Sequence, residues 1–189
     1  MKSIVKTLLV LAVTTTTVFA TTTPIKKKIN IKESSIEWKG KKVLGSHTGT
    51  IQLKEGYLEM DGNKLTGGMF VVDMTSINVT DLEGDSKGKL EGHLKSDDFF
   101  GTASHPTATL LIKKATKTKS GFEVTADITI KDTTEEITFI LKMKDNTATT
   151  SLKIDRTKFG VRYGSGSFFD NLGDNTISDN FELDVTLKF

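Results

Sequence analysis

The stretch that decides the fold reads "FEVTADITIK" and covers residues 122–131. Its apolar residues fall on every second position: Phe122, Val124, Ala126, Ile128 and Ile130. In an extended chain, successive side chains point to opposite faces of a sheet. The alternation therefore predicts an antiparallel strand with one buried face and one face in water.

The same alternation recurs in "EEITFILKMK" (135–144) and "NFELDVTLKF" (180–189). Turn signals separate such runs: "KEG" (54–56), "DGN" (61–63), "KSG" (119–121), "KDTT" (131–134) and "KDNT" (144–147). Eight or nine strands are predicted, with the first two runs taken as one, at 29–33, 35–43, 46–53, 57–61, 64–74, 107–117, 121–131, 135–145, 147–155 and 178–189. Long hairpin-linked strands with one apolar face must close on themselves or stack as two sheets, and their length favours an all-β, eight-stranded antiparallel barrel.

Two segments break the strand pattern. Residues 81–100 predict one short helical insert, because Leu90, His93, Leu94 and Asp97 share a helical face and two phenylalanines, Phe99 and Phe100, follow. Gly88 and Gly92 each cost about 1 kcal/mol of helix propensity, so this helix needs a packing partner. The second break, residues 156–174, predicts a long Gly- and Ser-rich loop that carries aromatic residues.

The first twenty residues have the layout of a secretory signal peptide. Lys2 and Lys6 flank the start of an apolar run that is too short to span a bilayer, and a cleavage site follows Ala20. Residues 21–189 are then expected to form a single domain. The sequence contains no cysteine, which excludes disulfides, thiolate chemistry and a lipid-modified cysteine anchor. We therefore expect a protein that is periplasmic or secreted after cleavage of the signal peptide.

The charge balance argues against nucleic acid or an anionic membrane as the partner. Loss of Lys2 and Lys6 with the signal peptide leaves 24 of the 26 basic residues against 24 acidic residues. A surface without net charge lacks the electrostatic attraction that drives binding to polyanions. Stable membrane insertion is not expected either, and the oligomeric state stays open, with a homodimer as one option.

No group of residues predicts catalysis, a cofactor or a metal site. His47, His93 and His105 stand in no recognisable motif, and none of them forms the local i, i+4 pair typical of metal ligands. Asp97 and Asp98 are adjacent, so on a helix their carboxylates would point apart. We expect a protein that is not an enzyme. The pattern leaves open whether the barrel encloses a ligand or is filled by its own side chains, since both occur with eight strands.

Five stretches together resemble the YceI-like family of secreted bacterial polyisoprenoid-binding proteins. They are "SHTGTIQLKEGYL" (46–58), "GGMFVVDMTSI" (67–77), "KLEGHLKSDDFFGTASHPTATL" (89–110), "VTADITIKDTTEEITF" (124–139) and "LKIDRTKFGVRYGSG" (152–166). The resemblance covers nearly all of the chain after the signal peptide. It implies a lipocalin-like barrel with an apolar tunnel that takes a long isoprenoid, such as a quinone or a polyprenyl tail, for transport or storage. It implies no metal and no catalytic residue.

On this resemblance, Phe99 and Phe100 close or line part of the tunnel, Phe159 adds to its lining, and Arg156 orders the late loop or meets a polar head group. The residues expected to bind the ligand are Trp38, Met60, Met69, Val71, Leu94, Phe99, Phe100, Leu110, Val124, Ala126, Ile128, Phe139, Leu141, Phe159, Phe181, Leu183 and Arg156.

Two alternatives stand beside this interpretation. One is a stress or adhesion protein with a packed core and no ligand. The other is an outer-membrane barrel, suggested by the alternating last strand that ends at Phe189. One Trp and two Tyr residues are too few to build the aromatic girdles of such a barrel, and a helical insert is foreign to that design.

Overall fold

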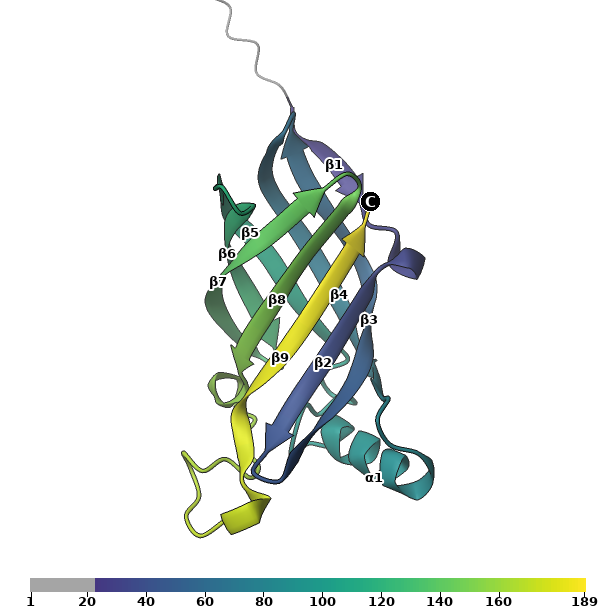
Figure 1. Ribbon diagram of the computed structural model, residues 1–189, viewed down its shortest axis with the longest axis vertical. Helices are drawn as coiled ribbons and strands as arrows, with labels where there is room; N and C mark the ends of the chain where they lie inside the picture. The colour runs from purple at the N-terminus through teal and green to yellow at the C-terminus, as the bar shows by residue number, and fades with distance from the viewer. Residues whose placement is uncertain (1–22) are drawn as a thin grey trace, which may run out of the picture.

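The computed structural model describes residues 23–189, whose strands form one closed barrel with a short helix at its lower end (Figure 1). The strands are β1 (Ile25–Lys28), β2 (Ser35–Lys42), β3 (Gly45–Asp61), β4 (Lys64–Val79), β5 (Thr107–Lys117), β6 (Phe122–Ile130), β7 (Thr133–Lys144), β8 (Thr147–Asp155) and β9 (Ile177–Lys188). The helix is α1 (Gly84–Lys95), and short 3-10 turns are η1 (Ile31–Glu33), η2 (Arg156–Phe159) and η3 (Gly173–Asn175). The proposed signal peptide lies outside the described residues.

The order of the strands closes the sheet on itself. It runs β3–β2–β9–β8–β7–β6–β5–β4, and β4 pairs again with β3, while β1 adds to the upper part of β3. All of the pairings between strands are antiparallel. The predicted eight-stranded antiparallel barrel with one helical insert is therefore confirmed.

Strand β3 corrects the predicted turn at residues 54–56. The chain continues through this stretch as a single strand, and its pairing with β4 shifts register between Leu53 and Glu55. A bulge of this kind absorbs an extra residue and bends the strand without ending it. The residue after the bulge, Gly56, has to be a glycine, because a Cβ there would lie 2.7 Å from a ring carbon of Phe70.

The N-terminal part of the domain also departs from the predicted strands. Residues 31–33 form η1 where an extended run was expected, and β1 occupies residues 25–28, where no strand was predicted. Strand β4 continues to Val79, five residues beyond its predicted end. The hairpins at residues 61–64, 130–133 and 144–147 lie where their turn signals predict them, with Gly62 (φ 56°), Lys131 (φ 54°) and Asp145 (φ 52°) in the left-handed region.

Buried side chains fill the end of the barrel that carries β1, and we call this end the packed half; it is the upper end of the ribbon in Figure 1. Its core residues are Ile29, Leu58, Met60, Leu65, Phe122, Val124, Ala126 and Ala148. A layer below them, called the floor, has Ile36, Leu53, Phe70, Ile112, Leu141 and Leu187. Below the floor the barrel interior is not filled, and this part is called the hollow half.

The wall of the hollow half has a gap between β7 and β8. These strands pair only between Lys142–Lys144 and Thr147–Thr149, although β7 pairs fully with β6, and β8 with β9. A cleft of about 590 Å³ lies along this gap. Lys158 of η2 bridges the lower end of the gap through an ion pair with Glu135 (3.6 Å). Elsewhere the hydrogen-bonded wall is continuous around the barrel.

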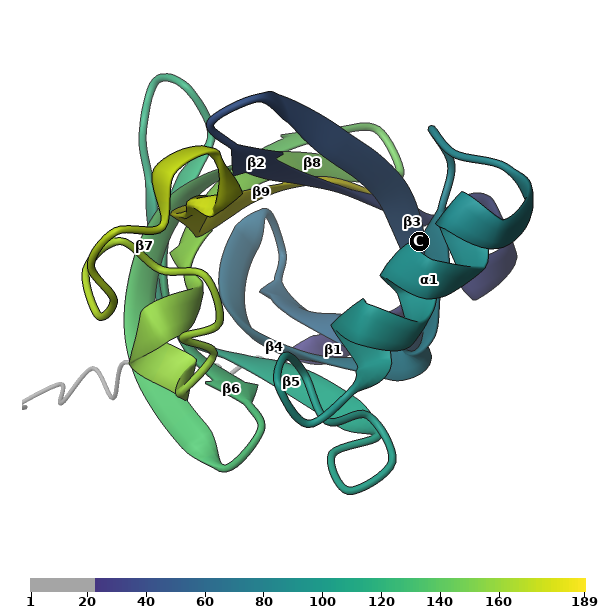
Figure 2. The ribbon, with the colours of Figure 1, turned by 90° about the horizontal axis from the view of Figure 1, so that it is seen from below.

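Helix α1 lies at the lower end, beside β3 and β4 (Figure 2). The side chain of Glu91 accepts a hydrogen bond from the backbone N–H of Val79 (2.8 Å), and Lys87 donates to the side chain of Asn78 (2.9 Å). These bonds to β4 provide the packing partner that a helix with two glycines requires. Within residues 23–189, no helix has the length and apolar character needed to cross a bilayer.

Candidate functional site

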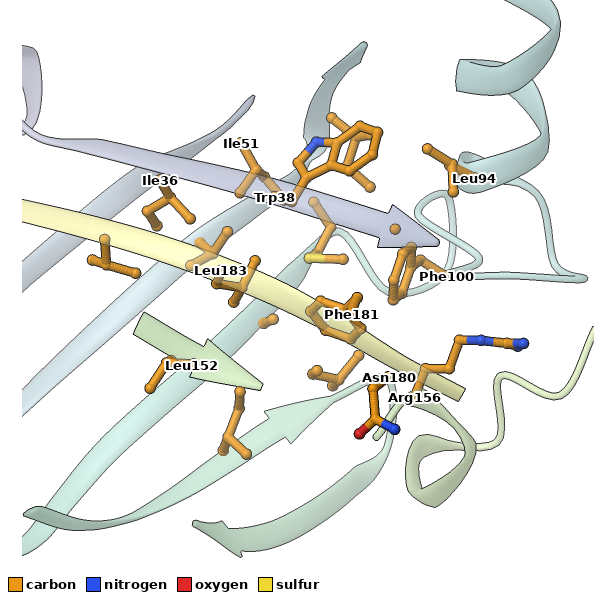
Figure 3. A pocket seen from close by; sticks show the side chains of 18 of the residues that line it. Ile36, Trp38, Ile51, Leu94, Phe100, Leu152, Arg156, Asn180, Phe181 and Leu183 are labelled. Carbon is orange, nitrogen blue, oxygen red and sulfur yellow. The ribbon is translucent and has the colours of Figure 1, made fainter. Parts of the chain in front are cut away.

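The hollow half encloses a cavity of about 750 Å³ that extends from the floor to the lower end of the barrel, and Figure 3 shows part of its lining. At the lower end its lining includes Lys41, Lys42 and Asn175, and this end is called the mouth. Its walls are apolar and include Ile51, Val72, Met74, Ile128, Leu152 and Leu183. The arrangement is an apolar container whose base is the packed half and whose wall shares Phe139 and Leu152 with the cleft between β7 and β8.

Strand alternation directs these side chains into the cavity. On β9, Phe181, Leu183 and Val185 line it, and on β4, Phe70 and Val72 do the same at every second position. The three β9 side chains stay only half-buried, because they pack against the core on one side and border the open space of the cavity on the other. The cavity is therefore a property of how the interior is filled and not of strand direction.

Trp38 forms part of the wall on β2. Its indole N–H donates to the carbonyl of Thr50 on β3 (3.2 Å), which fixes the ring against the neighbouring strand. Gly49 makes this position available, since a Cβ there would lie 2.4 Å from the indole and 2.1 Å from the carbonyl oxygen of Asn78. The absence of a side chain at Gly49 therefore leaves the space that the Trp38 indole occupies.

A row of aromatic rings runs along the mouth. Centroid distances are 6.1 Å for Phe181–Phe100, 5.7 Å for Phe100–Phe99, 5.1 Å for Phe99–His93 and 4.4 Å for His93–Tyr163, all with edge-to-face geometry. Such contacts stabilise aromatic pairs beyond their buried area. The row joins β9, the segment after α1, α1 itself and the loop after η2, so it holds the four elements that surround the mouth together.

Arg156 is a buried cation at the same end (Figure 3). Its guanidinium donates to the carbonyls of Ser178 (2.9 Å), Val161 (2.8 Å) and Ile177 (3.1 Å), and lies 5.3 Å from the Phe99 ring centroid. Burial lowers the pKa of Arg156, and the nearby carboxylates, Asp179 first, oppose this. The side chain joins the loop after η2 to the start of β9.

Asp179 is the acidic partner of Arg156, at 3.8 Å. Burial by itself would raise the pKa of Asp179, but the hydroxyls of Ser165 and Ser167 and the charge of Arg156 hold it below its usual range. Hydrogen bonds to the charged form favour that form. The mouth is therefore stabilised by polar contacts where the packed half is stabilised by apolar contacts.

The structure brings most of the predicted site residues together. Those that line the cavity are Trp38, Leu94, Phe99, Phe100, Leu110, Ile128, Phe139, Leu141, Phe181, Leu183 and Arg156. Their role in binding remains a prediction, since no ligand is present.

Six predicted residues lie away from the cavity wall. Met60, Val124 and Ala126 are buried in the packed half, and Phe159 is buried in the core beneath the wall. Met69 and Val71 alternate with the inward-facing Phe70 and Val72 and thus lie on the outer side of β4. Apolar residues occupy both faces in this part of β4, so alternation could not assign the inner one.

Several wall and mouth residues were not anticipated. Leu152 and Val185 follow the alternation of their strands, so this signal could have found them. Ile36 and Ile51 alternate with polar neighbours in the same way, so this signal could have found them too. Tyr163 stands in a loop without alternation, and only the closed barrel places it at the cavity.

The three histidines lie apart and do not form a metal site. His47 contacts Asp81 (Nδ1 to Oδ2, 3.0 Å), His105 contacts Asp132 (3.4 Å), and His93 belongs to the aromatic row. Within the part of the chain that the structure describes, no three His, Asp or Glu side chains come together in an arrangement that could hold a metal ion.

Comparison with known proteins connects this architecture to a family. The YceI-like domain family matches residues 28–189. The sequence has no match among curated proteins.

Solved structures with a similar fold include BcnA of Burkholderia cenocepacia, with a TM-score of 0.67, 19% identity, and coverage of 84% of this chain and 98% of that one. A polyisoprenoid-binding domain from Saccharophagus degradans has a TM-score of 0.61 and 17% identity, covering 85% and 95%. The YceI protein of Campylobacter jejuni has a TM-score of 0.53 and 17% identity, covering 74% and 84%. At these identities the likeness is one of fold.

Proposed function

The chain belongs to the YceI-like family, and on that premise we propose that its hollow half binds one isoprenoid lipid. The observation that carries the proposal is an apolar cavity of about 750 Å³ inside the barrel, with its base at the floor. This volume lies in the range of sites that enclose a single small ligand. The fold shared with the polyisoprenoid-binding domain of Saccharophagus degradans supports the same ligand class.

The apolar tail would enter first and extend to the floor. Each buried methylene contributes about 0.8 kcal/mol, so one five-carbon isoprene unit supplies roughly 4 kcal/mol of gross driving force. For a tail of several units, this gross driving force exceeds the largest binding free energies that are measured, because association has its own cost and affinity saturates. Affinity then discriminates weakly between tails, and the depth of the floor becomes the selective feature.

The polar head would remain at the mouth, where Asn180, Ser178 and Tyr163 line the cavity beside the aromatic row. Arg156 spends three guanidinium donors on backbone carbonyls, and Asp179 balances its charge. Lys41 and Lys42 at the mouth are exposed to water, and Lys41 is paired with Glu182. An uncharged head that accepts hydrogen bonds and stacks on aromatic rings therefore suits this environment better than a phosphate. We infer a quinone-like head in preference to a polyprenyl phosphate.

The role would be transport or storage without catalysis, in the periplasm or outside the cell. This location is the one expected for the family and for a chain with the predicted signal peptide.

Mass spectrometry of an organic extract tests the proposal. Protein purified from its native host without detergent should release an isoprenoid in about equimolar amount, given a single cavity. If the extract contains no prenyl lipid and the lipid-free protein fails to bind a fluorescent prenyl alcohol, the ligand-free alternative replaces this one.

A further inference from the structure

The exposed large apolar side chains of the described residues gather at the mouth. Val43, Leu44, Phe168 and Phe169 are 59%, 68%, 46% and 51% exposed, and they form what we call the rim patch. Tyr163, which lines the cavity, is 48% exposed beside them. Outside the mouth, this class contains only Ile25, Ile31 and Leu111 among residues 23–189. Exposed apolar patches on soluble folds mark surfaces that contact another apolar phase.

Backbone hydrogen bonds hold the two parts of the rim patch next to each other. The N–H of Val43, in the β2–β3 turn, donates to the carbonyl of Thr176 (3.1 Å). Ser165 bridges to Ile177, and its carbonyl accepts from the N–H groups of Phe168 (3.2 Å) and Phe169 (3.0 Å). The turn and the loop both lie at the lower end in Figure 1. The patch is therefore a held surface and not the tip of a loose chain.

The chemistry of the patch matches the interface of a bilayer. Arg162 lies 4.5 Å over the ring of Phe168, and Lys41 and Lys42 precede Val43. Aromatic and aliphatic tips backed by cations suit a surface that enters the head-group region while the charges stay in water. Asp170 and Asp174 in the same loop offset these cations, so the attraction rests on apolar contact and not on net charge.

We propose that the rim patch docks the mouth onto the surface of a phospholipid bilayer, so that an isoprenoid passes between membrane and cavity without crossing water. This inference rests on the proposed ligand class. A prenyl lipid has almost no free concentration in water, because each methylene left there costs about as much as its burial gains. When the apolar side chains around the mouth contact the bilayer, the lipid can move into the cavity without being exposed to water. Docking is peripheral and reversible, with no strand or helix inserted.

Vesicle sedimentation with the purified, lipid-free protein tests the docking. Phosphatidylcholine vesicles should bind the wild type, and the variant Leu44→Ser/Phe168→Ser/Phe169→Ser should bind at least about tenfold less, because three apolar tips are lost. The matched control Ile25→Ser/Leu111→Ser removes exposed apolar residues far from the mouth and should bind like the wild type. Adding phosphatidylglycerol should change wild-type binding by less than about twofold.

A second readout uses a dansyl-labelled farnesol as the probe. Both variants should bind this probe in solution like the wild type, since none of the changed residues lines the cavity. The rate of probe transfer to vesicles should rise with vesicle concentration for the wild type and the control, and not for the rim variant. Failure of the wild type to bind the probe would overturn the proposed function. The vesicle-binding results bear only on the docking, so the two failures can be told apart.

Three outcomes overturn the docking. The first is equal vesicle binding by the wild type and the rim variant, and the second is an equal loss in the control. The third comes from analytical ultracentrifugation: a wild-type dimer that the rim substitutions dissociate, with vesicle binding unchanged, would assign the patch to a second copy of the chain.

Discussion

Strands β6 and β9 carry the same alternation of apolar and polar residues, yet their inward side chains meet different surroundings. On β6, Phe122, Val124 and Ala126 are buried against other side chains of the packed half. On β9, Phe181 and Leu183 stay half-buried and face the cavity. Alternation thus reports which way a side chain points, and only its neighbours across the barrel decide whether it is packed.

The difference between the halves has a structural origin at each end. In the packed half, β1 adds to β3, and Asn30 just before η1 donates from its N–H to the carbonyl of Lys188 (2.7 Å), so the N-terminal segment covers this end. In the hollow half, β7 and β8 separate, and loops held by Arg156 and the aromatic row surround the opening. Apolar packing supports one half, and polar and ring contacts support the other.

The largest expected effect comes from comparing the same Leu→Ala substitution in the packed half and in the cavity wall. Leu58→Ala, at a fully buried site of the packed half, should lower the free energy of unfolding by about 2–5 kcal/mol. Leu183→Ala, on the cavity wall, should cost about half as much, because its inner side has few contacts to lose. Urea unfolding of lipid-free protein measures both, and equal losses would show that the two halves are equally packed.

A buried charge should separate lining from surface. Phe139→Asp places a carboxylate in the cavity wall and should weaken binding of the dansyl-labelled farnesol by roughly 100-fold, since the tail cannot satisfy it. Glu123→Ala on the outer face of the neighbouring β6 should leave affinity unchanged. Circular dichroism establishes that both variants are folded. Unchanged affinity in a folded Phe139→Asp protein would show that the prenyl tail does not contact this part of the wall.

The floor should set the length of the tail. Phe70→Ala removes six carbon atoms at the boundary between the halves and should lengthen the preferred prenyl alcohol by about one five-carbon unit. Competition among prenyl alcohols of increasing length measures the shift. Leu111→Ala on the outer wall is the control and should show the wild-type preference. A common preference in all three proteins would mean that the floor does not limit the ligand.

The smallest effect concerns acid. The folded state lowers the pKa of Asp179, so its carboxylate contributes stability above its unfolded pKa, near 3.8, and this contribution is lost as pH falls through the folded value. Asp179→Asn should therefore be less stable than the wild type at pH 7 by about 1 kcal/mol at most, and the gap should narrow at pH 3. Urea unfolding at both values checks this, and a gap that widens in acid would contradict the assigned sign.

The sequence predicted much of the fold because strand alternation and turn chemistry are local signals. The hairpins after Asp61, Ile130 and Lys144 lie where glycine, asparagine or aspartate signals predict them. Local reasoning failed at residues 54–56, where a register shift absorbs a turn-like triplet, since the partner strand β4 keeps the chain extended. It also missed β1, whose residues are all exposed and which exists only because the upper part of β3 offers an edge.

The candidate site was less accessible to the same reasoning. Trp38, Phe100 and Phe181 were predicted as lining and do line the cavity. Val124 and Ala126 have equally clear inward patterns and lie in the packed half. Distance along the barrel axis separates the two groups, and a single strand carries no mark of where the filled part of the interior ends.

By itself, the sequence determined that this chain would build a strand-rich barrel with an apolar interior and a short helix that needs support. Those properties follow from the residues of each segment and their nearest neighbours along the chain. The pairing of β2 with β9, the gap between β7 and β8, and the position of the floor were decided by the tertiary structure alone. They depend on how side chains from strands far apart in sequence fill the interior together. This packing is defined only when the barrel is closed.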